Sequence, residues 1–302
     1  MKLVTWNVQW FCGLDGRVDV ARVVDTARAM TDFDVLCLQE VAVGYPGLAG
    51  DAGFDQPARL ASLLPGFSVV FGAATDELGP DGARRQFGNL IATRLPVLQV
   101  RHHPLPWPAD PTASSMPRLC TVATLATTQG PVRVMTTHLE YFSGRQRHAQ
   151  AQALLALHRE ACALAEHPPK QVPDSAGGAP EDTPFGPKPH TARAILCGDF
   201  NSGLAHPEYA LLQSDGGPGG SRLVDAWRVA HPDVPHAPTF RVFDKRYGKT
   251  PTAFDFVFVS EGLAPFVRRV AVNLETRASD HQPVLLELAD PRAPVARGRP
   301  SR

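Results

Sequence analysis

Short apolar runs that end in a single polar or acidic side chain recur along this chain, and they constrain its fold more than any other feature. Residues 2–8 alternate between two faces, and Asn7 stands near the end of one face. Residues 34–39 are nearly all apolar, which is typical of a strand buried on both faces, and Glu40 follows as that run ends. Further strands are expected at 67–71, 90–93, 121–127, 132–138, 192–197, 255–260 and 283–288.

Helical patterns stand between these runs. Apolar residues at steps of three and four predict helices over 18–30 and 144–166, the second capped by Ser143, and a short helix is expected at 57–64. The Pro-rich stretch 102–117 should be irregular. Strands and helices mixed in this order favour stacked sheets covered by outer helices.

Residues 167–190 are crowded with Pro and Gly and show no apolar period, so we expect a flexible surface insertion there. A buried strand resumes directly afterwards, so the insertion does not mark a domain boundary. We therefore predict a single domain over 1–289, followed by a disordered tail over 290–302.

Composition excludes some classes of protein. The 302 residues include 30 basic and 30 acidic side chains, so no strong overall charge favours binding to nucleic acid. This balance does not exclude a local basic groove. The 5 cysteines are widely spaced, and Cys37 and Cys197 lie in apolar runs, which indicates reduced core residues. No targeting segment or membrane-spanning run is visible, and we expect a cytoplasmic protein without membrane insertion.

Two acidic motifs, at residues 198–201 and 279–281, give the first indication of chemistry. Hydrolysis of a phosphoester requires charge neutralisation at the phosphoryl oxygens, an activated water and a stabilised leaving oxygen. Magnesium suits the first and last tasks and takes oxygen ligands. Glu40 is the first candidate ligand, and Asn7 offers an amide oxygen to the same ion or to a bridging water. Taken alone, Glu40 also fits a solvated strand exit and Asn7 a turn.

Asp199 and Asn201 are two residues apart, just past a predicted buried strand. If the backbone stays extended, both side chains project to the same side. One would orient or deprotonate water, and the other would donate a hydrogen bond to phosphate. An Asx turn explains the same pair of residues as well.

His281 is the candidate phosphate clamp, since a protonated imidazole donates to a phosphoryl oxygen. Asp255 lies inside the apolar segment 254–258, where a carboxylate is costly to bury unless it is paired. We therefore expect Asp255 to hold His281. His138 ends another strand and would contact the phosphate or a metal-bound water.

In combination and in this order, these motifs resemble the endonuclease/exonuclease/phosphatase superfamily, which includes deoxyribonuclease I, exonuclease III-type repair endonucleases, sphingomyelinases and inositol-polyphosphate 5-phosphatases. The matching segments extend over nearly the whole chain. They are residues 5–8 (TWNV), 38–40 (LQE), 88–91 (GNLI), 137–139 (THL), 198–201 (GDFN), 254–258 (FDFVF) and 279–284 (SDHQPV).

The resemblance implies an α+β fold, a four-layer αββα sandwich in which two packed mixed β-sheets are flanked by helices. It implies that Glu40 is the principal ligand of Mg²⁺, or of Mn²⁺, with Asn7 beside it and Asp280 contributing. A second metal position is in doubt, because Gln9 stands where some relatives carry an acidic residue. A monomer is the default for this family.

The resemblance also implies catalytic roles. Asp199 would act as the base or water-orienting group, and Asn201 would contact phosphate. His281, held by Asp255, would stabilise the phosphoryl transition state, and His138 would assist at the phosphate.

Substrate contacts are less defined by the resemblance. Asn89 matches the family weakly as a substrate contact, and a turn Asn before a strand explains it equally. Arg145 could reach a substrate phosphate from a helix N-terminus, or it could be a solvated helix residue. Tyr141 and Phe142 could stack on a base, although core packing is the expectation. The basic segment 245–249 is the best local hint of nucleic acid.

The leading hypothesis is a divalent-metal-dependent phosphodiesterase, a nuclease acting on nucleic acid. The alternative is a phosphodiesterase or phosphatase acting on a phospholipid, an inositol phosphate or another small phosphoester. A binding module on a dead catalytic fold is disfavoured, because the chain keeps every residue to which the resemblance assigns a catalytic role.

Overall fold

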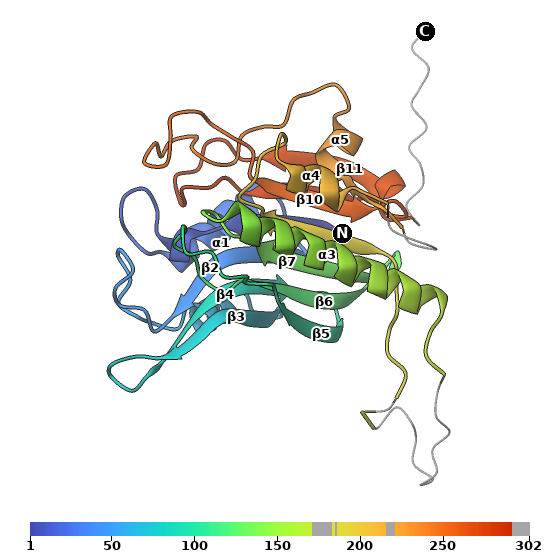
Figure 1. The fold of residues 1–302 in the computed structure, drawn as a ribbon, viewed down its shortest axis with the longest axis horizontal. Helices are drawn as coiled ribbons and strands as arrows, with labels where there is room; N and C mark the ends of the chain where they lie inside the picture. Colours follow the sequence, from blue (N-terminus) through green and yellow to red (C-terminus); the bar gives the residue numbers. More distant parts are fainter. Residues whose placement is uncertain (171–182, 185, 216–220, 292–302) are drawn as a thin grey trace.

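The computed structural model describes residues 1–170, 183–184, 186–215 and 221–291 (Figure 1). Most of the predicted surface insertion, residues 171–182 and 185, therefore lies outside the described residues. The same holds for residues 292–302 of the predicted tail. Within the described residues, no helix is long and apolar enough to cross a membrane.

The first sheet has six strands and is mixed, because β1 and β2 run parallel while every other neighbouring pair is antiparallel. In spatial order its strands are β11 (Val267–Val272), β12 (Val284–Leu288), β1 (Lys2–Asn7), β2 (Val35–Val43), β4 (Arg84–Thr93) and β3 (Ser68–Leu78).

The second sheet also has six strands and is mixed, with β7 and β8 as its parallel pair. In spatial order its strands are β5 (Val97–Pro104), β6 (Leu119–Thr127), β7 (Gly130–His138), β8 (Ala194–Asp199), β10 (Asp255–Ser260) and β9 (Leu223–Asp225).

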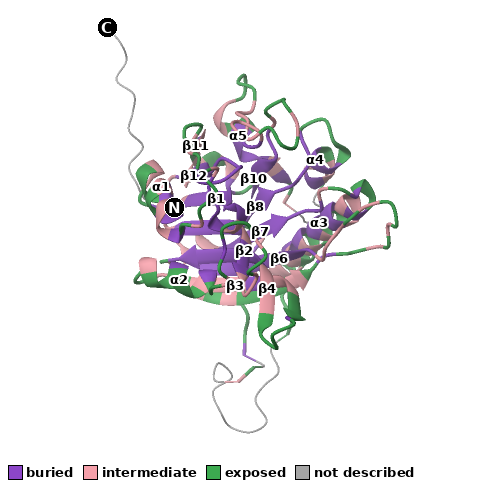
Figure 2. Ribbon diagram, turned by 90° about the vertical axis from the view of Figure 1, so that its left-hand side faces the viewer, coloured by how far each residue is buried: buried purple, intermediate pink, exposed green. Residues whose placement is uncertain are grey.

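The two sheets pack face to face, and the alternation of side chains divides the core into layers. In β1, Leu3 joins the cluster between the sheets, which also holds Val134 and Ile195 of the second sheet. Its neighbours Val4 and Trp6 point the other way, into the cluster beneath the helices of the first sheet. Figure 2 shows the buried strands at the centre of the molecule.

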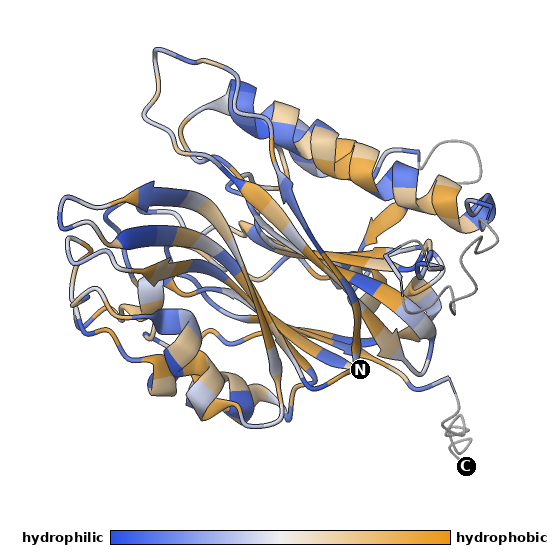
Figure 3. Ribbon diagram, turned by 90° about the horizontal axis from the view of Figure 1, so that it is seen from below, coloured by the Kyte–Doolittle hydropathy of each residue, from blue (hydrophilic) through white to orange (hydrophobic). Residues whose placement is uncertain are grey.

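Helices cover both outer faces, so the predicted αββα sandwich is confirmed. Helices α1 (Val20–Met30) and α2 (Gln56–Leu63) pack on the first sheet, and α3 (Gly144–Glu166) and α4 (Pro207–Leu212) pack on the second. Figure 3 shows hydrophobic residues concentrated along the strands between these helices. Beside this frame stand α5 (Ala226–Ala230) and the 3-10 turns η1 (Gln9–Phe11) and η3 (Ala264–Phe266).

Helix α3 begins and ends where the sequence predicts. The side chain of Ser143 accepts a hydrogen bond from the backbone N–H of Gln146 at 3.2 Å, which satisfies one of the free donors of the first turn. Cys37 and Cys197 are buried and free, as predicted.

Several strands differ from the prediction. The stretch 102–117 is irregular only after Pro104, because its first residues belong to the edge strand β5, which pairs with β6 alone. Strands β3 and β4 continue past the apolar runs into a polar hairpin. The elements α4, α5, β9 and β11 were not predicted, since short or half-exposed elements carry little periodic signal.

Candidate active site

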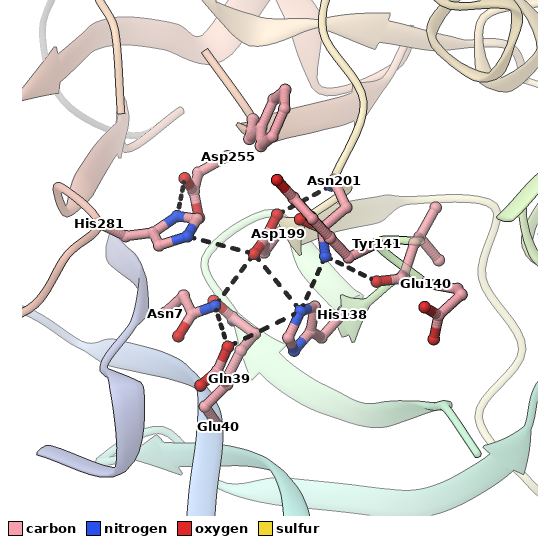
Figure 4. A network of polar contacts seen from close by, with 12 residues as sticks. Asn7, Gln39, Glu40, His138, Glu140, Tyr141, Asp199, Asn201, Asp255 and His281 are labelled. Carbon is pink, nitrogen blue, oxygen red and sulfur yellow. Dashed lines mark hydrogen bonds and ion pairs between the residues drawn. The ribbon is translucent and has the colours of Figure 1, made fainter. Parts of the chain in front are cut away.

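The ends of several strands meet at one edge of the sandwich and bring the predicted polar side chains together (Figure 4). Asp199, the last residue of β8, pairs with His138 of β7 on one side and with Asp255 of β10 on the other. Three functional side chains therefore lie in one row across the second sheet. Asn7, at the end of β1, approaches this row from the first sheet, with its amide nitrogen 3.0 Å from Asp199 Oδ2.

Gly198 allows β8 to pass close to β7 just before the site. Its φ is 134°, and a Cβ atom at this position would lie 2.0 Å from the carbonyl oxygen of Thr137. Such a contact is impossible without moving the backbone, so only glycine fits here. This close approach carries the chain directly to Asp199.

The sequence suggested that Glu40 follows the end of its strand. In the structure, Glu40 instead lies at a β-bulge within that strand. Strand β2 continues to Val43, but its pairing with β4 jumps from Leu38–Leu90 to Val41–Gly88. Glu40 itself has a φ of 60°, in the left-handed region. The bulge re-aims the carboxylate toward the site, where Oε1 accepts a hydrogen bond of 2.9 Å from the Asn7 amide.

Asp199 is the centre of the polar network. Its Oδ2 atom accepts the hydrogen bond from Asn7 and lies 3.5 Å from His138 Nε2 and 3.6 Å from His281 Nε2. Burial raises the pKa of Asp199 to about 6, and the nearby Asp255 adds to the rise, while His281 and Asn7 oppose it. A carboxylate with a pKa close to neutral is suited to orient water or take its proton.

His281 is held by Asp255, as predicted. The Nδ1 atom lies 2.8 Å from Asp255 Oδ2, and both side chains are buried. The ring also stacks on Phe240, with centroids 4.5 Å apart. Burial alone would lower the pKa of His281, but the charges of Asp255 and Asp199 outweigh it and hold the pKa well above its ordinary value. The imidazolium form is thus favoured beside Asp199.

His138 has the opposite character. The amide nitrogen of Asn201 lies 3.0 Å from His138 Nε2 and also donates to the carbonyl oxygen of Leu139. The amide donates, so Nε2 must accept and the imidazole is neutral. Burial, helped by the nearby Arg118, keeps the pKa of His138 well below its ordinary value. The contacts of His138 with the carboxylates are therefore not ion pairs.

Asn201 does not follow Asp199 on an extended backbone. Its φ is 47°, and its backbone N–H donates to Asp199 Oδ1 at 2.8 Å. The Asx turn considered as the alternative is what the structure contains. Because the turn redirects the chain, Asn201 contacts His138 instead of lying parallel to Asp199.

Two acidic side chains crowd the other side of the site. Burial raises the pKa of Glu40 to about 7, and repulsion from Asp280 contributes to that rise. Asp280 accepts a hydrogen bond of 3.2 Å from the side chain of Gln9. Burial also raises the pKa of Asp280. Each of these carboxylates disfavours ionisation of the other. A divalent cation bound between them would stabilise their ionised forms.

A second group of donors lies close by. One ligand atom from each of Asp199, Asp255 and His281 falls within 4.8 Å of the others, a spacing compatible with a metal ion. However, His281 already engages Asp255 through Nδ1 and favours the protonated form, which has no lone pair for a metal. Oxygen donors on the side of Glu40 fit a hard cation better than this group does.

A pocket of about 180 Å³ opens directly onto this network. Its walls include Glu40, Asp199, His138, Asp280 and His281. Arg118, which the sequence did not indicate, also lines the pocket and forms an ion pair of 3.2 Å with Glu140. It stands just before β6, the neighbour of the strand that ends at His138. The only sequence signal for this residue was its position directly before the apolar run that forms β6.

Aromatic rings surround the pocket. Phe142 is 62% exposed and Tyr247 is 50% exposed, and the ring of Tyr141 lies 4.9 Å from that of Phe142 and 6.0 Å from that of Tyr247. The expectation that Tyr141 and Phe142 pack in the core is therefore wrong. We call the pocket-lining aromatic residues the aromatic rim; they are Trp10, Tyr141, Phe142, Phe240 and Tyr247.

Two predicted residues lie away from the pocket, and a third, Asn7, reaches the network with its amide in an unexpected orientation. Asn89 is buried, donates to the carbonyl oxygen of Leu119 and lines a small neighbouring cavity rather than the pocket. Arg145 is exposed and donates to the carbonyl oxygen of Ala109. Asn7 turns its amide nitrogen to the carboxylates, while its amide oxygen accepts from the backbone of Gln9. The proposed substrate and metal roles of these residues stay predictions.

Comparison with known proteins extends these observations. Residues 4–170 and 173–281 match the sequence profile of the Endonuclease/Exonuclease/phosphatase family. Among curated proteins, none is significantly similar in sequence. Many solved structures share the fold, and three of them illustrate its range.

An endonuclease/exonuclease/phosphatase from Beutenbergia cavernae is 25% identical, with a TM-score of 0.64 over 95% of this chain and 71% of the other. A mannosyl-6-phosphatase from Bacteroides thetaiotaomicron is 19% identical, with a TM-score of 0.64 over 96% and 99%. D. rerio TDP2, solved with a single-strand DNA product, is 20% identical, with a TM-score of 0.59 over 95% and 97%. The profile match spans nearly the whole chain, and this protein therefore belongs to the endonuclease/exonuclease/phosphatase family of phosphoester hydrolases.

Proposed function

We propose that this protein is a divalent-metal-dependent phosphodiesterase whose substrate is single-stranded nucleic acid. The observation that carries the catalytic part is the position of Asp199. It is a buried carboxylate with a pKa of about 6, placed between a cationic His281 and the amide of Asn7, at the base of an open pocket. Such a group can orient a water molecule toward phosphorus and accept its proton.

His281 supplies positive charge where the phosphoryl oxygens would lie. Asp255 accepts the hydrogen bond from Nδ1 of His281. The Nε2–H of His281 therefore stays near Asp199 in the pocket and can donate to a phosphoryl oxygen. Arg118 adds a second cation to the pocket wall. Both groups are held in place before substrate binds, so little reorganisation is needed as charge develops.

Glu40 and Asp280 would hold the cation, and the amide nitrogen of Asn7 would orient the Glu40 carboxylate through its hydrogen bond. The raised pKa values of Glu40 and Asp280 indicate like charges that a cation would relieve. An all-oxygen donor set favours Mg²⁺, and Mn²⁺ would also fit. When bound, the ion would polarise the phosphoryl group and stabilise the leaving oxygen.

The aromatic rim supports nucleic acid as the substrate. Exposed rings such as Phe142 and Tyr247 can stack on unpaired bases, which contributes about 1–3 kcal/mol per base and requires little sequence preference. Arg246, which pairs with Asp244 at 2.7 Å, lies over the ring of Tyr247, 6.0 Å from its centroid, and holds that ring through a cation–π contact. A paired duplex would hide the base faces, so a single strand fits the rim best.

A small phosphoester is the second candidate, supported by the zero net charge of the chain. The mannosyl-6-phosphatase has the same fold, so the fold accommodates such a substrate in that protein. Under this alternative the rim would contact a sugar or another small organic group.

The test is hydrolysis of single-stranded DNA, plasmid DNA, bis-(p-nitrophenyl) phosphate and p-nitrophenyl phosphate, with Mg²⁺, Mn²⁺ or EDTA. Asp199→Asn is the inactivating variant, and Asp34→Asn, which alters a carboxylate paired with Arg94 outside the pocket, is its matched control. Metal-dependent cleavage of single-stranded DNA that is lost only in Asp199→Asn would support the proposal. Hydrolysis of the monoester alone would favour the second candidate, and activity that survives Asp199→Asn would contradict the catalytic assignment.

A further inference from the structure

A second pocket, of about 170 Å³, lies between the second sheet and the C-terminal half of α3. Figure 1 shows α3 crossing the outer face of that sheet. We call this second pocket the α3 pocket. It shares no lining residue with the catalytic pocket. Its walls come from β5, β6 and β7, from α3 and from the segment that precedes β8. Its lining includes Arg101, His103, Arg133, Glu160, Lys188 and His190.

Arg133 stands at the base of this pocket, and its surroundings are unusual for a buried cation. Its side chain is 8% exposed, yet no carboxylate of the described residues lies within 4.0 Å of its guanidinium. Its contacts are the carbonyl oxygen of Thr191 at 3.2 Å, the ring nitrogen of His158 at 2.8 Å and the thioether of Met135 at 3.6 Å. A buried charge without a counter-ion is costly.

The guanidinium also keeps unused donor capacity. Arginine carries five N–H groups, and the three contacts of Arg133 engage only some of them, one through a weak sulfur acceptor. His158 cannot supply negative charge, because its Nδ1 atom accepts from Arg133 while its Nε2–H donates to the carbonyl oxygen of Ser221 at 2.7 Å. The remaining donors are therefore available to a ligand in the pocket.

The rest of the lining is also positive. Arg101 and Lys188 add two permanent charges, and Glu160 is the single carboxylate among the lining residues. His103 and His190 can donate hydrogen bonds in either protonation state. Like charges held this close repel one another, and an anion in the pocket would remove that repulsion.

We propose that the α3 pocket is a binding site for a phosphate group, either as inorganic phosphate or as the terminal group of a phosphomonoester. Arginine donors match the tetrahedral oxygens of phosphate, and the buried position strengthens each contact. Apolar side chains of Met135, Leu157 and Leu164 also line the pocket and would accept an organic substituent. This inference rests on the α3 pocket alone and is independent of the proposed function.

The experiment is isothermal titration calorimetry of the full chain in EDTA at constant ionic strength, with inorganic phosphate in one arm and phenyl phosphate in the other. Arg133→Gln tests the central donor. Because that change could disturb folding, two further variants keep the test decisive: Arg101→Glu reverses an exposed charge, and Ala161→Trp fills the cavity. Arg268→Glu, an exposed charge reversal on β11 away from the pocket, is the matched control.

The expected result is saturable binding of one equivalent, weakened at least tenfold by Arg101→Glu and by Ala161→Trp and unchanged by Arg268→Glu. His281→Ala, which alters the catalytic pocket, should leave this binding intact. Binding of both probes would identify the phosphate group alone as the ligand, and binding of phenyl phosphate only would identify an organic monoester. Binding that fails to saturate, that persists in both pocket variants, or that disappears in His281→Ala would overturn the proposal.

Discussion

The Nδ1 atom of His281 lies 2.8 Å from Asp255 Oδ2, although the two residues are 26 positions apart and His281 lies in the loop between two strands of the first sheet. Residues 279–281 follow the first sheet's strand β11, whereas Asp255 opens β10 of the second sheet. The pair therefore joins the two halves of the sandwich at the site. On the pocket side, Nε2 of His281 lies 3.6 Å from Asp199 Oδ2.

Asp255→Asn should lower kcat while preserving the fold. The amide keeps the volume of the carboxylate but removes the charge that favours the imidazolium form of His281. Loss of a positioned acid or of its orientation costs roughly 10²- to 10⁴-fold in rate. Steady-state kinetics on a phosphodiester and circular dichroism would measure the two effects. Asp34→Asn is the matched control, and equal activity of the two variants would contradict this role.

A divalent cation should stabilise the protein against heat, and Glu40→Gln should abolish most of that effect. The carboxylate has a pKa of about 7 because of burial and the neighbouring Asp280, so an ion relieves an unfavourable charge. At a concentration 100-fold above Kd, the gain is about 2.7 kcal/mol. Differential scanning fluorimetry with Mg²⁺, Mn²⁺ and EDTA would measure it.

Glu77→Gln is the matched control for this experiment, since Glu77 is exposed and contacts Tyr45 outside the pocket. This variant should keep the full response to the cation. If Glu40→Gln responds as strongly as the unaltered protein, the cation binds through other residues, and the assignment of Glu40 fails.

Phe142→Ala and Tyr247→Ala should raise KM for single-stranded DNA and leave kcat nearly unchanged. Each substitution removes an exposed ring at the pocket mouth without touching the catalytic network. Loss of one stacked base is expected to cost about 1–3 kcal/mol, which is roughly 5- to 150-fold in affinity. Trp107, which is 53% exposed and does not line the pocket, provides the control variant Trp107→Ala. A fall in kcat at constant KM would argue against a stacking role.

Stability should fall as pH is lowered, in part through His158. Burial, with the nearby Arg133, lowers the pKa of this buried histidine to about 4. The unfolded chain, with an ordinary pKa of about 6.5, then takes up a proton before the folded state does. The contribution is complete above the unfolded pKa and is lost as pH falls from about 6.5 to about 4, amounting to about 3 kcal/mol.

Urea unfolding of the unaltered protein and of His158→Gln at both ends of this pH window would isolate that contribution. Glutamine can still accept from Arg133 and donate to the Ser221 carbonyl, but it does not titrate. The variant should therefore lose less stability on acidification. His148→Gln, which replaces another histidine of the same helix, is the matched control. Identical pH profiles for all three proteins would refute the assignment to His158.

The apolar runs predicted the central strands and the long helices well, because periodicity reports burial on one or both faces. Helix α3 and strand β10 have the predicted bounds. Edge strand β5 escaped prediction because none of its residues is fully buried, so it lacks an apolar run, and its sequence leads into a Pro-rich stretch. The hairpin of β3 and β4 was cut short for the same reason, since its tip is polar and exposed.

For the candidate site, the sequence by itself indicated which polar side chains would come together. A carboxylate inside an apolar strand, as at Asp255, is costly to bury and therefore requires a partner. Polar residues at the ends of neighbouring strands lie at the same edge of the sheet and are therefore close together. From this follow the pairing with His281 and the convergence of Asp199, His138 and Asn7, all of which are present.

Only the tertiary structure decided how the side chains are aimed and what surrounds them. Strand register and contacts between distant segments determine these features. They are the bulge that turns Glu40, the turn that redirects Asn201, the position of Arg118 in the pocket wall and the exposure of Phe142. Periodicity along one strand carries no information about its neighbour's register, since a shift of one residue moves a side chain to the opposite face. The residues of the candidate site can thus be identified from the sequence, whereas the shape of the pocket arises from the packing of the two sheets.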